Sequence, residues 1–465
     1  MGNVLTTEVS RKVSSVAWPS KFFYPAVSST ILIFVAIWLL IPWAWSPVDD
    51  PGQVIAMQRE IADFGRVSGT FNRFTQFYQG DQAGGVFRPA AWTFAPLLYQ
   101  LPVVLAHLVR LLMVFAVILG PVIYFRRAGA SSSRLWLTLF IIIAGASTLY
   151  QGLFLLSIQE LGGAACVGLG LMARRIPARM ALWLAAALFK APFAWLLLGY
   201  SAYLWKQKRR LEASISGGLG IGILGISALW SRNGSYSGSY NPDPFNLAIY
   251  ENFSRLVEPM NALLLVGLIW WLVVTNSSVK RHPDWILFFV AWVGYTLQMI
   301  PWGVTAYYMG PISYLFAIFL ASVLVNVENA STRQIAVGLL MPIFVAFWLT
   351  RITLNLGFEI NSVMLESKKC LAPLSGSSTV INGSLLYVTS SPEGPIRIKD
   401  QIVLEDPSWT GDINREDPTL NGFMDPSTTH YLTIRDVQIP EGRDSTEVCS
   451  GSAIILSELG PVATS

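Results

Sequence analysis

Long apolar runs separated by clusters of lysine and arginine are the feature that most limits how this chain can fold. The run Phe22–Trp45 is long enough to cross a lipid bilayer, and Arg11, Lys12 and Lys21 precede it. Basic residues favour the cytoplasmic side and tryptophans favour the interface, so we expect residues 1–21 to be cytoplasmic. Because no small-residue cleavage site is present in this stretch, we interpret it as an anchor.

The same rule orients the remaining apolar runs. Charged residues make up 13% of the chain and the mean hydropathy is +0.50, whereas soluble domains carry about 25% charged residues. We therefore predict an α-helical polytopic protein of the inner or plasma membrane, with about eleven membrane segments within residues 22–357. Besides Phe22–Trp45 and the hairpin described next, the expected segments are Leu98–Phe125, Leu135–Ser157, Leu161–Met172, Ala213–Trp230, Leu256–Val274, Trp285–Ile300, Tyr308–Val327 and Ile335–Leu354.

The run Met180–Trp205 has basic clusters on both sides. Both of its ends should then be cytoplasmic, so the run has to turn back within the membrane. Lys190, followed by Ala191 and Pro192, marks the expected turn. A re-entrant hairpin is stable only where protein or a water-filled cavity satisfies its backbone, so we expect a polar cavity at membrane depth.

Residues 358–465 have a different composition from the rest of the chain. They hold about 15 acidic and about 7 basic residues and no long apolar run. Short alternating patches at Ser384–Thr389, Ile396–Leu404 and Tyr431–Ile439 predict a small β-rich domain, which the topology places outside the cytoplasm. There Cys370 and Cys449 could form a disulfide or remain free thiols.

The first outer loop, residues 46–90, contains the adjacent carboxylates Asp49 and Asp50. Asp50 before Pro51 is a typical helix start, an interpretation that leaves Asp49 unexplained. As an alternative, Asp49 is a general base and Asp50 orients it or the acceptor, since paired carboxylates at an apolar interface have raised pKa values. Ile55, Ile61 and Phe64 indicate a short amphipathic helix in the same loop.

Three further charged residues, two basic and one acidic, are candidate site residues near the outer face of the membrane. Arg88 could extend toward lipid headgroups or clamp a phosphate with its planar guanidinium. Lys190 lies inside an apolar run and needs a partner, which could be a bound phosphate, a site carboxylate or a structural ion pair. Glu160 lies at the outer end of the third span, either in an interfacial turn or facing the proposed cavity.

Trp302, Tyr307 and Tyr308 cluster at another outer helix junction. Tyrosine and tryptophan belong at membrane interfaces, so an aromatic belt is the simple interpretation and a sugar-stacking surface is the functional one. The three histidines have no metal-ligand spacing, and no nucleotide-binding motif is present. We attribute the basic excess of the membrane region to topology and expect no nucleic-acid partner.

These residues resemble the GT-C superfamily of integral-membrane glycosyltransferases. The resemblance rests on Asp49-Asp50 after the first span, an interfacial helix in the same loop, Phe87-Arg88-Pro89 before the second span, about eleven segments and a C-terminal extracytoplasmic domain. It covers about residues 22–356. It implies that an outer-loop carboxylate is the base, that a sugar on a polyprenyl phosphate is the donor, and that basic residues hold its phosphate.

On this basis Asp49 and Asp50 are the expected catalytic residues, and Arg88, Lys190 and Glu160 the expected donor-binding residues. The acceptor would be a cell-envelope glycan or lipid, and the reaction would invert the anomeric carbon. Paired carboxylates could bind Mg²⁺ or Mn²⁺, although no full oxygen-ligand set is visible. A polysaccharide polymerase or ligase and a membrane transporter are the alternatives; no internal repeat supports the transporter.

Overall fold

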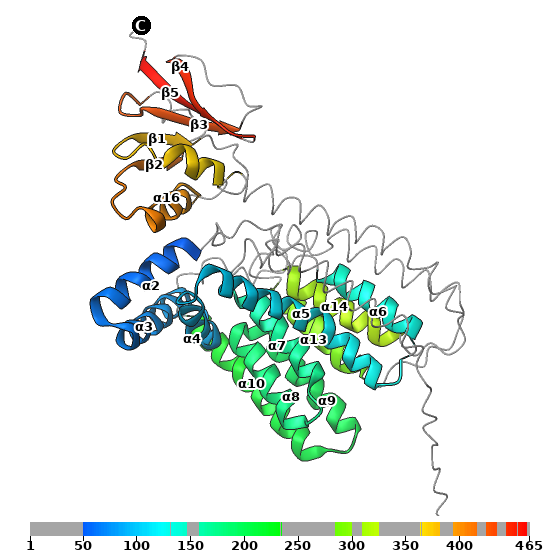
Figure 1. The fold of residues 1–465 in the computed structure, drawn as a ribbon. Coiled ribbons are helices and arrows are strands. Elements are labelled where there is room, and N and C mark those ends of the chain that lie inside the picture. Colours follow the sequence, from blue (N-terminus) through cyan, green and yellow to red (C-terminus); the bar gives the residue numbers. More distant parts are fainter. Residues whose placement is uncertain are drawn as a thin grey trace, which may run out of the picture. The chain divides into compact units, whose positions relative to one another are not determined.

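The computed structural model describes residues 50–130, 132–146, 158–232, 234, 284–299, 309–324, 363, 365–381, 394–415, 425–434, 443–452 and 454–462. These residues form a helical body and a C-terminal mixed β-sheet (Figure 1). The helices of the body are α2 (Asp50–Phe64), α3 (Arg66–Gly84), α4 (Pro89–Leu98), α5 (Val103–Arg127), α6 (Ser132–Gly145), α7 (Ile158–Met172), α8 (Ile176–Phe189), the 3-10 turn η2 (Ala191–Phe193), α9 (Ala194–Lys206), α10 (Arg210–Ser231), α13 (Trp285–Met299) and α14 (Met309–Leu324).

Most helices of this body after α3 are rich in apolar residues, whereas α2 and α3 carry many polar side chains. Two of the described helices, α5 and α10, are long and apolar enough to cross a membrane. Four shorter apolar helices, of 10–17 residues, belong to α7, α8, α13 and α14. The expected segments Phe22–Trp45, Leu256–Val274 and Ile335–Leu354 lie outside the described residues.

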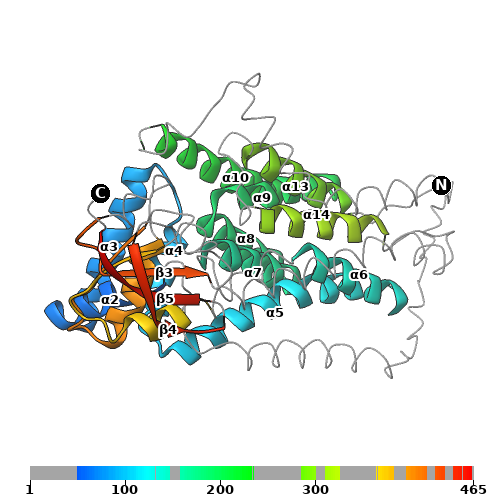
Figure 2. The ribbon, with the colours of Figure 1, turned by 90° about the horizontal axis from the view of Figure 1, so that it is seen from above.

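Helices α5 and α7 lie side by side because glycines let their backbones approach closely (Figure 2). A Cβ added to Gly168 of α7 would lie 2.0 Å from the carbonyl oxygen of Ala116 in α5. A Cβ added to Gly120 would lie 2.4 Å from the carbonyl oxygen of Gly168. Small residues at a contact of this kind are typical of helix pairs in membranes, where packing rather than burial from water drives association.

The chain reverses between α8 and α9, at the turn expected from the basic clusters. Lys190 has extended backbone angles of −153° and 114°, which end α8, and Pro192 follows within η2. The indole of Trp183 in α8 contacts the ring of Tyr200 in α9 edge to face, with centroids 5.0 Å apart. Residues on either side of Lys190 therefore face each other, as in a helical hairpin.

The described residues of the expected first outer loop fold into α2 and α3, where the sequence predicted one short helix. Gly65 separates the two helices with a φ of 78°, a left-handed conformation that favours glycine. The helices pack on each other, and a Cβ on Gly69 would lie 2.4 Å from the carbonyl oxygen of Glu60. The expected helix residue Ile61 packs toward the core, whereas Phe64 is 57% exposed at the turn.

The C-terminal region contains β1 (Ser378–Ile381), α16 (Gly394–Glu405), β2 (Asp412–Arg415), β3 (His430–Ile434), β4 (Arg443–Ser450) and β5 (Ile454–Val462). The strand order is β2-β1-β3-β5-β4. β1 pairs in parallel with β2 and β3, and β5 pairs antiparallel with β3 and β4. Buried Val380, Tyr431 and Leu459 pack together on the sheet.

The prediction of a strand at Ile396–Leu404 is wrong, because these residues belong to α16. Ile398 and Ile402 are both buried and lie four residues apart, so they share one face of a helix. Pro395 lies in the first helical turn, where proline is well tolerated. The patch Tyr431–Ile439 is a strand up to Ile434, and Ser384–Thr389 lies outside the described residues.

Candidate functional site

The first turn of α7 holds two basic side chains from distant parts of the chain. Glu160 accepts a hydrogen bond from Nζ of Lys190, and the two groups form an ion pair. The Lys190 side chain is 12% exposed and that of Glu160 is 2% exposed. Both charged groups are thus largely buried, and a buried charge needs a partner of opposite charge.

Glycines in α7 allow the tip of the α8–α9 hairpin to reach this turn. The rings of Phe189 and Phe193 flank the turn, and they lie against Gly162 and Gly163. Any side chain at these glycines would overlap the rings, since an added Cβ would lie 2.8 Å from Phe189 and 2.4 Å from Phe193. The two contacts place Lys190, between the phenylalanines, at Glu160.

Arg88 reaches the same turn of α7 from the segment before α4. Its Nε and Nη2 atoms donate to the two carboxylate oxygens of Asp81, at 2.6 and 2.5 Å. Its Nη1 atom donates to Oε1 of Gln159, the residue before Glu160. The Arg88 side chain is 28% exposed, whereas that of Asp81 is 7% exposed. Arg88 and Lys190 thus contact adjacent residues of α7, Gln159 and Glu160.

An aromatic cluster lies beside the Asp81–Arg88 pair. Nε1 of Trp92 donates to Oδ2 of Asp81, and its ring stacks on Trp230 with centroids 5.6 Å apart. Tyr78 and Phe87 both meet these two indoles edge to face. The cluster joins the Asp81–Arg88 pair to α10, because Trp230 belongs to that helix.

The predicted catalytic pair is described only in part. Asp50 is the first residue of α2, whereas the sequence predicted it as the N-cap before Pro51, and Asp49 lies outside the described residues. The helix is anchored one turn later by Val54, which is buried in an apolar cluster that also contains Ile158. Ile158 immediately precedes Gln159 and Glu160 in α7, so the start of α2 and the start of α7 share one core.

Of the other predicted site residues, Arg88, Lys190 and Glu160 come together, while Trp302, Tyr307 and Tyr308 lie outside the described residues. Among the described residues, no group of three or more His, Cys, Asp or Glu side chains could hold a metal ion. Sequence reasoning missed the roles of Asp81 and Trp92 as partners in this cluster. The available signal in the sequence was an acid near an arginine in a loop of mixed charge. Several acids of residues 46–90 fit this signal, so it did not select Asp81.

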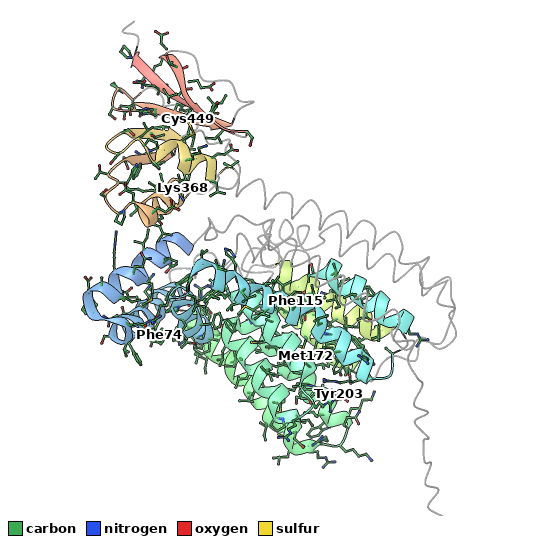
Figure 3. The ribbon with its side chains drawn as sticks, viewed as in Figure 1. Phe74, Phe115, Met172, Tyr203, Lys368 and Cys449 are labelled. Atoms are coloured by element: carbon green, nitrogen blue, oxygen red, sulfur yellow. A yellow bond between two sulfur atoms is a disulfide. The ribbon has the colours of Figure 1, made fainter. Side chains whose placement is uncertain are left out.

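A disulfide joins Cys370 to Cys449 of β4, the pair for which the sequence left two states open (Figure 3). The bond links residues 79 positions apart, with Cα atoms separated by 5.7 Å. It ties the segment before β1 to an edge strand of the sheet.

Comparison with known proteins gave one similar structure. No protein family and no curated protein matches the sequence. The fold is similar to the crystal structure of ArnT from Cupriavidus metallidurans in the apo state, with 13% identity and a TM-score of 0.45. The similarity covers 93% of this chain and 98% of the ArnT chain.

Proposed function

We propose that this protein is a membrane glycosyltransferase that moves a sugar from a polyprenyl phosphate to a glycan or lipid of the cell envelope. The observation that carries the proposal is the gathering of Arg88 and Lys190 on the first turn of α7. Two cations near the end of apolar helices fit the phosphate of a lipid carrier, whose tail stays in the bilayer. The start of α7 adds the partial positive charge of a helix N-terminus.

The proposed reaction needs a base and a stabilised leaving group. Asp49 takes the proton from the acceptor hydroxyl as its oxygen attacks the anomeric carbon of the donor sugar. The bond between that carbon and the phosphate oxygen breaks, and polyprenyl phosphate leaves with the bonding electrons. Arg88 and Lys190 stabilise the charge that develops on the phosphate. Attack opposite the leaving group inverts the anomeric carbon.

The carboxylates beside the two cations have a defined part in this scheme. Glu160 and Asp81 keep the cations charged and in place while no donor is bound. A phosphate that enters then competes with them for the same N–H donors. We propose that Asp50 caps α2 and so orients Asp49, and that Trp302, Tyr307 and Tyr308 stack on the sugar or acceptor. A bound Mg²⁺ or Mn²⁺ is not required by the scheme.

We place the reaction at the outer face of the cell membrane, with the C-terminal domain on the same side. The distribution of the basic clusters along the sequence supports this placement. The aromatic residues beside the Asp81–Arg88 pair would limit hydrolysis of the donor by excluding water. The donor would enter sideways from the outer leaflet, as its lipid tail requires.

Transfer of radiolabelled sugar from a polyprenyl phosphate tests the proposal, with the purified protein in nanodiscs. The variant Asp49→Asn should lose transfer by at least about 10²-fold, the usual contribution of a general base. Asp63→Asn is the matched control, since Asp63 is an exposed acid of α2. Full transfer by Asp49→Asn would show that the assigned base is wrong. Products that grow to long chains would indicate a polymerase instead.

A further inference from the structure

We propose that Asp81 is a positioning residue, which holds the guanidinium of Arg88 in the orientation that receives the donor phosphate. The inference rests on the proposed function for the identity of that ligand. Asp81 itself lies beneath the arginine and would not touch the substrate, since its side chain is 7% exposed and that of Arg88 is 28% exposed.

The geometry of the pair fixes the plane of the guanidinium. Nε and Nη2 of Arg88 donate to different oxygens of Asp81, at 2.6 and 2.5 Å, and such a two-point contact removes rotation about the side chain's last bonds. The carboxylate is fixed in turn by Trp92, whose Nε1 donates to Oδ2. Gln159 holds the remaining side of the guanidinium through Nη1.

The backbone between the two residues forms a turn that brings them together. Asp81 lies in the last turn of α3, and its carbonyl oxygen accepts a hydrogen bond from the N–H of Val86 at 2.8 Å. Gly85 ends the helix in the left-handed conformation, with a φ of 78°. The chain turns there, so that Arg88 faces the acid seven residues before it.

Charge supplies a second reason for an acid at this position. Arg88 and Lys190 carry like charges, contact adjacent residues of α7 and are largely withdrawn from solvent, so solvent does little to screen their repulsion. Glu160 compensates Lys190, and Asp81 compensates Arg88. Without Asp81 the two cations would separate, and a phosphate would then meet one cation at a time.

A merely structural salt bridge would have the same distances, so the test measures the coupling of Asp81 to Arg88 during catalysis. Four proteins in nanodiscs are compared: wild type, Asp81→Asn, Arg88→Ala and the double variant. We expect Asp81→Asn to raise the KM for the polyprenyl-phosphate sugar about tenfold and to lower kcat as well, because Arg88 also stabilises the charge that develops on the phosphate in the transition state. In the Arg88→Ala background the same change should alter KM less than about twofold.

An equal rise of KM in both backgrounds would overturn the inference, as would an unchanged KM in Asp81→Asn. Asp63→Asn is the control for loss of an acid from the same loop. Thermal unfolding of each variant reports whether it folds. The conservative Asp81→Asn keeps the shape of the side chain, and Arg88→Lys provides a second measure of the same coupling if Arg88→Ala does not fold.

Binding of polyprenyl phosphate alone separates this inference from the proposed function. If wild type transfers no sugar, the proposed function fails, and the same four proteins are then compared by their Kd for polyprenyl phosphate. A coupled loss of affinity would support the role of Asp81 at an anion site. Absence of binding by wild type would overturn both proposals.

Discussion

Removal of one partner from the Lys190–Glu160 pair should destabilise the protein far more than removal of both. In Lys190→Met, Glu160 keeps its charge although its side chain is only 2% exposed. A buried charge that loses its ion-pair partner costs about 3–5 kcal/mol. The double variant Lys190→Met with Glu160→Met carries neither charge of this pair, and its two methionines fill about the same volume. Its stability should lie within about 1 kcal/mol of that of wild type.

Unfolding by SDS in mixed micelles measures these differences, with four proteins forming a double-mutant cycle. Since each single variant should cost about 3–5 kcal/mol and the double variant about 1 kcal/mol at most, we expect a coupling energy of at least about 5 kcal/mol between the two substitutions. Lys206→Met is the control, since Lys206 is an exposed lysine at the end of α9 and should change stability by less than about 0.5 kcal/mol. A double variant that is as unstable as the sum of the two single variants would refute the reasoning.

Three further results are expected. Gly163→Ala should lower the free energy of unfolding by about 1–3 kcal/mol, because its Cβ would lie 2.4 Å from the ring of Phe193. The control Gly225→Ala, whose Cβ would have no atom within 4 Å, should not destabilise the protein. SDS unfolding measures both variants. Cys370→Ser should lower the free energy of unfolding by about 4 kcal/mol, since the disulfide links residues 79 positions apart. A chemical unfolding curve of wild type that reducing agent does not shift would contradict this. Burial holds the pKa of His430 below its ordinary value of 6.5, against the opposing charge of Glu458, so the neutral ring is favoured in the fold. The resulting stability is complete above about pH 6.5 and is lost as pH falls through the folded-state pKa, and His430→Gln should reduce this dependence in thermal unfolding curves.

The turn at Lys190 could be predicted from sequence because its signal is local. Basic clusters at both ends of one apolar run require the run to reverse, whatever the neighbouring helices do. The partner of Lys190 could not be predicted in the same way. Its pairing with Glu160 depends on Gly162 and Gly163, which let the hairpin tip pack on α7.

The contact between Arg88 and Asp81 shows the same limit. The expected outer loop, residues 46–90, contains several acids of similar sequence context. The length of α3 and the turn at Gly85 bring Asp81, among these acids, to Arg88. In the C-terminal region, Ile396, Ile398 and Ile402 fit a strand or a helix about equally well over so short a run. Burial of the pair Ile398 and Ile402 on one helix face decided the outcome.

The most direct test of the central claim is the release of polyprenyl phosphate by the purified protein in nanodiscs, given a polyprenyl-phosphate sugar and an envelope acceptor. The account predicts one polyprenyl phosphate released for each sugar transferred by wild type and almost none by Asp49→Asn. Movement of the intact donor across the bilayer with no release, or equal release by both proteins, would contradict it.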